Sequence, residues 1–242
     1  MFVNGITSSN DCRIPSTRSR QRDLFELFGI YSLVLLVIWT PRPWQGPMLA
    51  VAALCTFCIV WLSYEGLGPM GLCTTNLTRS LWAVALAVVL AMAAVMLAGR
   101  LHTLHVPTTP YLFFRRYGAY IVWAGVQQLV LQCFFLSRAL RLMPDPVSAA
   151  ALSAGLFAIA HLPNPLLTVV TLICGLASCL FFVRYRNLWP LAIAHAILGV
   201  CIAITIPGSM HHNMRVGLGY LTYVDRSALP HAIPSSKPQR QN

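Results

Sequence analysis

The feature that most constrains this chain is a series of apolar runs that carry almost no charge. Several approach the roughly 20 residues that a helix needs to cross a bilayer. Proline or glycine falls between the runs, as expected where helices end. The pattern predicts an all-α fold, a polytopic transmembrane helix bundle of about seven spanning helices, with six to eight as the range. The runs lie at about 24–40, 47–64, 80–98, 117–137, 147–161, 165–183 and 188–206.

Composition and the placement of charge both favour a membrane protein. Hydrophobic residues make up 57% of the 242 residues and charged residues 10%, whereas soluble domains average about 25% charged residues. A formal charge of +11 could indicate nucleic acid as a partner. The arginines before the first apolar run argue otherwise, because positive charge beside a span is retained on the cytoplasmic side. We expect the lipid bilayer as partner, no nucleic acid, and a cytoplasmic N-terminus. Those arginines are Arg13, Arg18, Arg20 and Arg22.

Three regions follow from this pattern. Residues 1–22 are rich in Arg and Ser, which predicts a disordered cytoplasmic tail. Residues 23–206 are the expected membrane domain, and the run at 24–40 lacks a following small-residue cleavage site, so we interpret it as a retained signal anchor. Residues 207–242 are richer in Pro, Ser and charge and are interpreted as a polar C-terminal tail. We expect a multi-pass integral protein of a bacterial inner membrane.

Polar side chains inside the apolar runs are the first place to look for function, since they are costly in hydrocarbon unless they find partners. Gln127, Gln128 and Gln132 interrupt one run, His161 ends another and His195 lies in the last. Gln127, His161 and His195 follow one another at equal intervals of 34 residues, enough for a helix, a turn and a return to similar depth. We predict that they meet in one internal cavity. The alternative is that each forms only an ordinary hydrogen bond between helices.

At these residues the sequence resembles the CPBP family, the CAAX-protease and bacteriocin-processing group of intramembrane proteases. The family carries Glu-Glu-x-x-x-Arg, Phe-x-x-x-His and His-x-x-x-Asn or Asp on successive helices. The corresponding segments here are Gln127-Gln128-Leu-Val-Leu-Gln132, Phe157-Ala-Ile-Ala-His161 and His195-Ala-Ile-Leu-Gly199, and only the second motif is intact. The likeness covers about residues 66–206.

The resemblance implies a site and also a change in it. By analogy, Gln127, Gln128, Gln132, His161 and His195 stand at catalytic positions, and Phe157, Asn164 and Gly199 line the substrate cavity. In the family a glutamate activates water and an asparagine helps to stabilise the oxyanion. An amide cannot take a proton from water, so the two glutamines remove the base. Gly199 removes a donor, for which Asn164 could substitute if its side chain turns inward.

A metal site is a third interpretation. His211 and His212 follow the last run closely, and with His161 and His195 they could supply the three or four nitrogen ligands that zinc binds. The family-like mechanism itself requires no cofactor. His102 and His105 lack a nearby acidic ligand and are interpreted as residues of the membrane interface.

Together these features favour a CAAX-protease-like intramembrane endopeptidase homologue in which glutamate-dependent proteolysis is altered or lost. If hydrolysis persists, His161 or His195 is the expected base and a membrane-proximal peptide or protein is the expected substrate. The first alternative is a non-catalytic membrane protein that binds a partner in the former active-site cavity, for example in immunity or sorting. The second is a histidine-ligated, metal-dependent membrane hydrolase.

Overall fold

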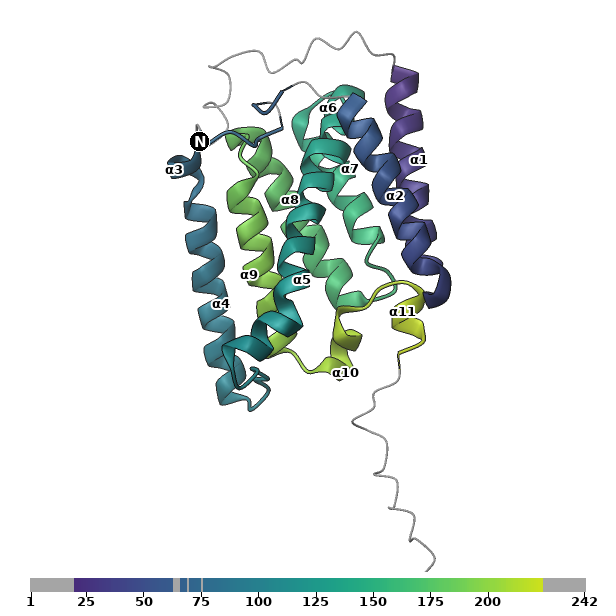
Figure 1. Cartoon of the computed structure of the whole chain (residues 1–242). Coiled ribbons are helices and arrows are strands. Elements are labelled where there is room, and N and C mark those ends of the chain that lie inside the picture. The colour runs from purple at the N-terminus through teal and green to yellow at the C-terminus, as the bar shows by residue number, and fades with distance from the viewer. Residues whose placement is uncertain (1–19, 63–65, 69, 75, 224–242) are drawn as a thin grey trace, which may run out of the picture.

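The computed structural model describes residues 20–62, 66–68, 70–74 and 76–223, and within these residues every regular element is a helix (Figure 1). The short helices are α3 (Leu77–Ser80), α10 (Gly208–His211) and α11 (Leu218–Leu221), and a 3₁₀ turn follows α10. The long elements are α1 (Arg20–Trp39), α2 (Arg42–Leu62), α4 (Trp82–Arg100), α5 (Pro110–Leu129), a π-helical segment (Val130–Leu136), α6 (Ser137–Leu142), α7 (Pro146–Ile159), α8 (Pro165–Tyr185) and α9 (Trp189–Thr205). The all-α fold class predicted from the sequence is confirmed.

The starts of three of these helices follow from local sequence. Thr109, Asp145 and Asn164 each precede a proline, and each side chain accepts a backbone N–H of the first turn of α5, α7 or α8. A capping side chain satisfies an otherwise unpaired backbone donor, and proline at the next position has no N–H to satisfy. These caps set the points at which the site-bearing helices begin.

The long helices run side by side in a bundle (Figure 1). Helices α4 and α5 both pack on α9, while α7 packs on α8. Helix α1 packs on α2 and, at one end, on α6. Beside α1 and α2, the bundle contains two groups, α4–α5–α9 and α7–α8, and the space between these two groups holds the candidate site.

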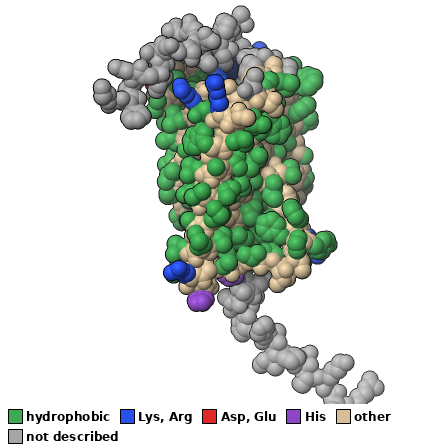
Figure 2. All heavy atoms as spheres, turned by 90° about the vertical axis from the view of Figure 1, so that its left-hand side faces the viewer, with side chains coloured by type: hydrophobic (Ala, Val, Ile, Leu, Met, Phe, Trp, Pro, Cys, Tyr) green, Lys and Arg blue, Asp and Glu red, His purple; other side chains and the backbone are tan. Residues whose placement is uncertain are grey.

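Length and hydropathy support a bilayer-spanning bundle. Among the described residues, four helical stretches are long and apolar enough to cross a membrane: Arg42–Leu62, Leu77–Arg100, Pro110–Leu142 and Pro165–Tyr185. Helices α7 and α9 are apolar but shorter. Figure 2 shows a broad hydrophobic surface on one face of the bundle, with Lys or Arg side chains near its two ends. The chain is an integral membrane protein; a count of about seven spans stays a prediction.

Charged side chains pair where α1 meets α6. Nε and Nη2 of Arg141 donate to the two carboxylate oxygens of Asp23, at 2.8 and 2.6 Å, and Nη2 of Arg138 donates to Glu26 at 2.9 Å. Asp23 and Arg138 are buried. We call Asp23, Glu26, Arg138 and Arg141 the charged layer. It fixes α1 to the end of the continuous α5–α6 stretch.

The segment after α9 is folded as far as Tyr223. Residues Gly208–His211 form α10, His212–Met214 form a 3₁₀ turn and Leu218–Leu221 form α11. The segment is tied to the turn before α8, because the N–H of Gly217 donates to the carbonyl of Leu162. Most of the predicted N-terminal tail, 1–19, and the end of the predicted C-terminal tail, 224–242, lie outside the described residues.

Candidate functional site

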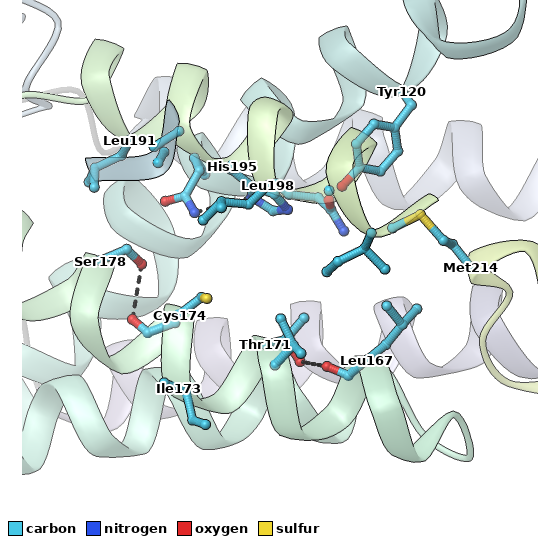
Figure 3. Close-up of a pocket in the computed structure, with 18 of the residues that line it drawn as sticks. Tyr120, Leu167, Thr171, Ile173, Cys174, Ser178, Leu191, His195, Leu198 and Met214 are labelled. Carbon is cyan, nitrogen blue, oxygen red and sulfur yellow. Dashed lines mark hydrogen bonds between the residues drawn. The ribbon is translucent and has the colours of Figure 1, made fainter. Parts of the chain in front are cut away.

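A cavity of about 680 Å³ lies between the α4–α5–α9 group and the α7–α8 group (Figure 3). Its wall is mostly apolar and receives side chains from all five helices and from the segment after α9. The residues singled out from the sequence that line it are the polar residues Gln127, Gln128, His161, His195 and His211 and the apolar residues Phe157 and Gly199. Gln132 lies behind the wall, fully buried.

Three of these polar side chains form a hydrogen-bonded chain. Nε2 of Gln132 donates to Oε1 of Gln128 at 3.0 Å and to Oγ of Ser178 at 3.1 Å. Nε2 of Gln128 in turn lies 3.2 Å from Nδ1 of His195. An amide N–H can only donate, so Nδ1 of His195 accepts and the ring hydrogen of neutral His195 is on Nε2. The two glutamines thereby set the tautomer of a histidine on another helix.

The position of Gln132 depends on a local change of helix type. It lies in the π-helical segment Val130–Leu136, which interrupts the α5–α6 stretch. Such segments are rare and are frequent at functional sites. Gln132 Oε1 has no hydrogen-bond partner among the described residues, while both hydrogens of its amide nitrogen are used. The side chain therefore acts as a donor toward Gln128 and Ser178.

The second motif holds neutral His161 in the opposite tautomer to that of His195. Nδ1 of His161 lies 2.7 Å from the carbonyl oxygen of Phe157, which can only accept, so Nδ1 carries the hydrogen and Nε2 has the lone pair. The Phe157 ring contacts both imidazoles edge-on, with ring centroids 4.8 Å from His161 and 6.1 Å from His195. The four-residue spacing of the motif thus lets one phenylalanine orient two histidines.

The two histidines differ in what they offer to the cavity. No described residue forms a hydrogen bond with Nε2 of either ring. His161 can accept a proton there, and His195 can donate a hydrogen bond there. Gln127 lines the cavity beside them and likewise has no hydrogen-bond partner among the described side chains. The arrangement can position a polar group of a ligand between an acceptor and a donor.

Gly199 has no side chain, and the ring of Tyr120 on α5 occupies the space that a side chain at residue 199 would fill. A Cβ atom at residue 199 would lie 1.7 Å from the Tyr120 hydroxyl oxygen. Tyr120 lines the cavity, although it was not predicted from the sequence. The only sequence signal was its position seven residues before Gln127, two turns away on the same side of the helix.

Asn164 does not line the cavity, so its predicted role as a substitute donor is wrong. Its Oδ1 caps α8 by accepting the N–H of Leu167 at 3.1 Å, and its Nδ2 donates to the carbonyls of His211 and Arg215 at 2.9 and 3.1 Å. The following Pro165 was a local signal for this capping role. All of its hydrogen-bonding capacity toward the cavity is therefore used elsewhere.

His211 and His212 do not join His161 and His195 as metal ligands. Nε2 of His211 lies 3.0 Å from the carbonyl of Ile206, and Nδ1 accepts the N–H of Met214 at 3.0 Å, so neither nitrogen has a lone pair left. Burial lowers the pKa of His211, which favours this neutral form. His212 stacks on Tyr220, with ring centroids 4.0 Å apart. Within the described residues, no group of three or more His, Cys, Asp or Glu side chains is placed to hold a metal ion.

Comparison with known families matches part of the chain. Residues 110–201 match the family model described as type II CAAX prenyl endopeptidase Rce1-like. This stretch runs from the start of α5 into α9. It contains Gln127, Gln128, Gln132, His161 and His195. No curated protein and no solved structure matches the chain.

Proposed function

Because residues 110–201 carry an Rce1-like domain of the CPBP family, we propose that this protein is an intramembrane peptide hydrolase that uses His161, in place of a glutamate, as its general base. One observation carries the proposal. Two histidines in opposite tautomers line one cavity: Nε2 of His161 has a lone pair, and Nε2 of His195 carries a hydrogen. Hydrolysis needs both an acceptor for the proton of water and a donor for the oxyanion.

In the proposed reaction, Nε2 of His161 takes a proton from a water molecule while the water oxygen bonds to the carbonyl carbon of a peptide. The Nε2–H of His195 donates to the oxyanion that forms. The C–N bond then breaks, and His161 returns the proton to the leaving nitrogen. The Phe157 carbonyl remains hydrogen-bonded to Nδ1–H of His161 throughout, so its dipole stabilises the transient imidazolium.

Lateral exposure of the cavity wall supports a substrate that arrives from the membrane. Leu86 and Leu90 of α4 and Ile173 of α8 all line the cavity, yet they are 48%, 50% and 64% exposed. These helices belong to the two different groups of the bundle. A peptide beside or within the bilayer could therefore enter between α4 and α8 without crossing a polar surface.

One feature favours a second candidate, a binding protein without turnover. No carboxylate is among the described residues that line the cavity, and Gln128 and Gln132 replace charge with a neutral hydrogen-bonded chain. A cavity of this kind could retain a peptide segment, for example in immunity or protein sorting. In that case His161 contributes a hydrogen bond to the ligand and performs no chemistry.

A cleavage assay in proteoliposomes tests the proposal. The substrate is a membrane-anchored peptide library with cleavage read by mass spectrometry, and the variants are His161→Ala and, as control, His105→Ala outside the cavity. We expect cleavage by the unmodified protein and by His105→Ala, and a loss of about 10²- to 10⁴-fold in His161→Ala, typical for a general base. Binding of peptide without cleavage by the unmodified protein would favour the second candidate.

A further inference from the structure

The contact between Tyr120 and Gly199 determines what can occupy one end of the cavity. A Cβ atom at residue 199 would lie 1.7 Å from the hydroxyl oxygen of Tyr120, 2.5 Å from Cζ and 2.7 Å from Cε1. Real Cβ atoms do not approach other atoms this closely. Glycine at 199 is therefore the condition for the observed position of the Tyr120 ring, and any side chain there would displace it.

Residue 199 is one helical turn beyond His195 on α9, so the two positions share a side of the helix, where Cβ positions four residues apart are about 5–6 Å from each other. The tip of the Tyr120 ring fills the space in which a side chain at residue 199 would begin. The Tyr120 hydroxyl thus reaches the cavity within about one turn of the His195 imidazole. Figure 3 shows Tyr120 on α5, with its hydroxyl end directed toward the cavity interior.

The Tyr120 hydroxyl has no hydrogen-bond partner among the described residues, although it lines a cavity whose other walls are mainly apolar. A hydroxyl in such a place has its hydrogen available for a ligand. Tyrosine is a known donor in oxyanion holes, where a low-dielectric surrounding strengthens the hydrogen bond to developing charge.

We propose that the Tyr120 hydroxyl is a catalytic oxyanion donor that acts beside the Nε2–H of His195, and that Gly199 exists to admit it. This inference rests on the proposed hydrolase function. It supplies the donor whose loss the sequence indicated at residue 199, from a different helix. The reaction keeps the same balance of atoms, because Tyr120 only donates a hydrogen bond and transfers no proton.

The first test is Tyr120→Phe in the proteoliposome cleavage assay. This variant keeps the ring in the space above Gly199 and removes only the hydroxyl. We expect kcat to fall by about 10²- to 10³-fold, as for the loss of one oxyanion donor, with KM and the thermal unfolding temperature nearly unchanged. Tyr111→Phe is the matched control, because Tyr111 lies on the same helix and is 72% exposed.

The second test moves the donor back to α9. Gly199→Asn alone should disrupt packing and activity, because the new side chain meets the Tyr120 ring. Tyr120→Ala should be as inactive as Tyr120→Phe, and the double variant Tyr120→Ala/Gly199→Asn should regain at least tenfold of the lost kcat. A purely structural role for Tyr120 would not produce this rescue.

The outcomes separate the two proposals. No turnover by the unmodified protein overturns the hydrolase function and, with it, the role of Tyr120. Turnover that is unchanged in Tyr120→Phe overturns the role of Tyr120 alone. Loss of kcat in Tyr120→Phe without recovery in the double variant shows that the hydroxyl does not act as an interchangeable oxyanion donor, and also overturns the inference.

Discussion

The bundle contains two polar regions in which buried side chains find partners in different ways, by ion pairs in one and by neutral hydrogen bonds in the other. In the charged layer, Asp23 and Glu26 of α1 pair with Arg141 and Arg138 at 2.6–2.9 Å. In the cavity, Gln132, Gln128 and His195 are linked through neutral hydrogen bonds of 3.0–3.2 Å. The charged layer lies at one end of the bundle (Figure 1), whereas the neutral chain lies along the cavity between the two helix groups.

The difference indicates where this chain tolerates charge. A buried charge needs an opposite charge and further hydrogen bonds, and the charged layer provides both. In the neutral chain, Gln132, Gln128 and His195 are joined by hydrogen bonds alone, so none of these three needs a charged partner. If the cavity performs the proposed hydrolysis, the proton acceptor is a group that is neutral at rest, and imidazole is such a group.

The largest effect is expected from breaking the charged layer. Asp23→Ala removes the carboxylate that accepts two hydrogen bonds from Arg141, at a position that is 1% exposed. The free energy of unfolding should fall by about 3–5 kcal/mol, the usual cost of removing one member of a buried pair. Thermal unfolding in nanodiscs measures it.

Arg22→Ala provides the control for that experiment. Arg22 also pairs with Glu26, at 2.8 Å, but its side chain is 51% exposed. An exposed pair contributes only about 0–1 kcal/mol. Equal losses of stability in Asp23→Ala and Arg22→Ala would show that burial does not distinguish the charged layer from an ordinary surface ion pair.

A smaller effect is expected from breaking the neutral chain. Gln132→Leu removes the donors to Gln128 and Ser178 and fills the space with an apolar side chain. Hydrogen bonds between membrane helices contribute about 0.6–2 kcal/mol, so the same unfolding assay should show a loss within that range. A loss as large as that of Asp23→Ala would mean that the two regions are energetically alike.

The smallest effect is expected on acidification, at the neutral His211. Its pKa is lowered by burial, so the contribution of neutral His211 to stability is full above the ordinary histidine pKa of about 6.5. That contribution is lost as the pH falls through the lower folded value. Protection of residues 206–217 against hydrogen exchange, corrected for the intrinsic pH dependence of amide exchange, should therefore fall at acid pH in the unmodified protein and fall less in His211→Gln. Corrected protection that does not change with pH would contradict this expectation.

The sequence was sufficient for the helical class, and each predicted apolar run overlaps a helix of the structure. Of the residues singled out, Gln127, Gln128, His161 and His195 line the cavity. Long apolar runs and equal spacing are signals that can be read along the chain, and the equal spacing is carried by Gln127, His161 and His195. The contact of Tyr120 with Gly199 is different, because two helices bring together residues with no regular spacing. Pairing of Asp23 with Arg141 was likewise beyond prediction, since several acids and arginines were available.

Asn164 shows a different limit. Its sequence context, with Pro165 next, is typical of a helix start, yet its nearness to His161 made a role in the cavity attractive. The structure decides between them, because both ends of its amide are used by the backbone. The side chain of Asn164 therefore caps α8, as Pro165 indicates, and its position three residues after His161 does not bring it into the cavity.

The measurement that tests the central claim most directly is chemical rescue of His161→Ala by imidazole. Removing the ring leaves a space of imidazole size beside the Phe157 carbonyl, within a cavity of about 680 Å³. The account predicts that the unmodified protein cleaves a membrane-anchored peptide, that His161→Ala loses about 10²- to 10⁴-fold of the rate, and that added imidazole restores part of it in a saturable manner. Undiminished cleavage in His161→Ala, or a lost rate that imidazole fails to restore, would contradict His161 as the base.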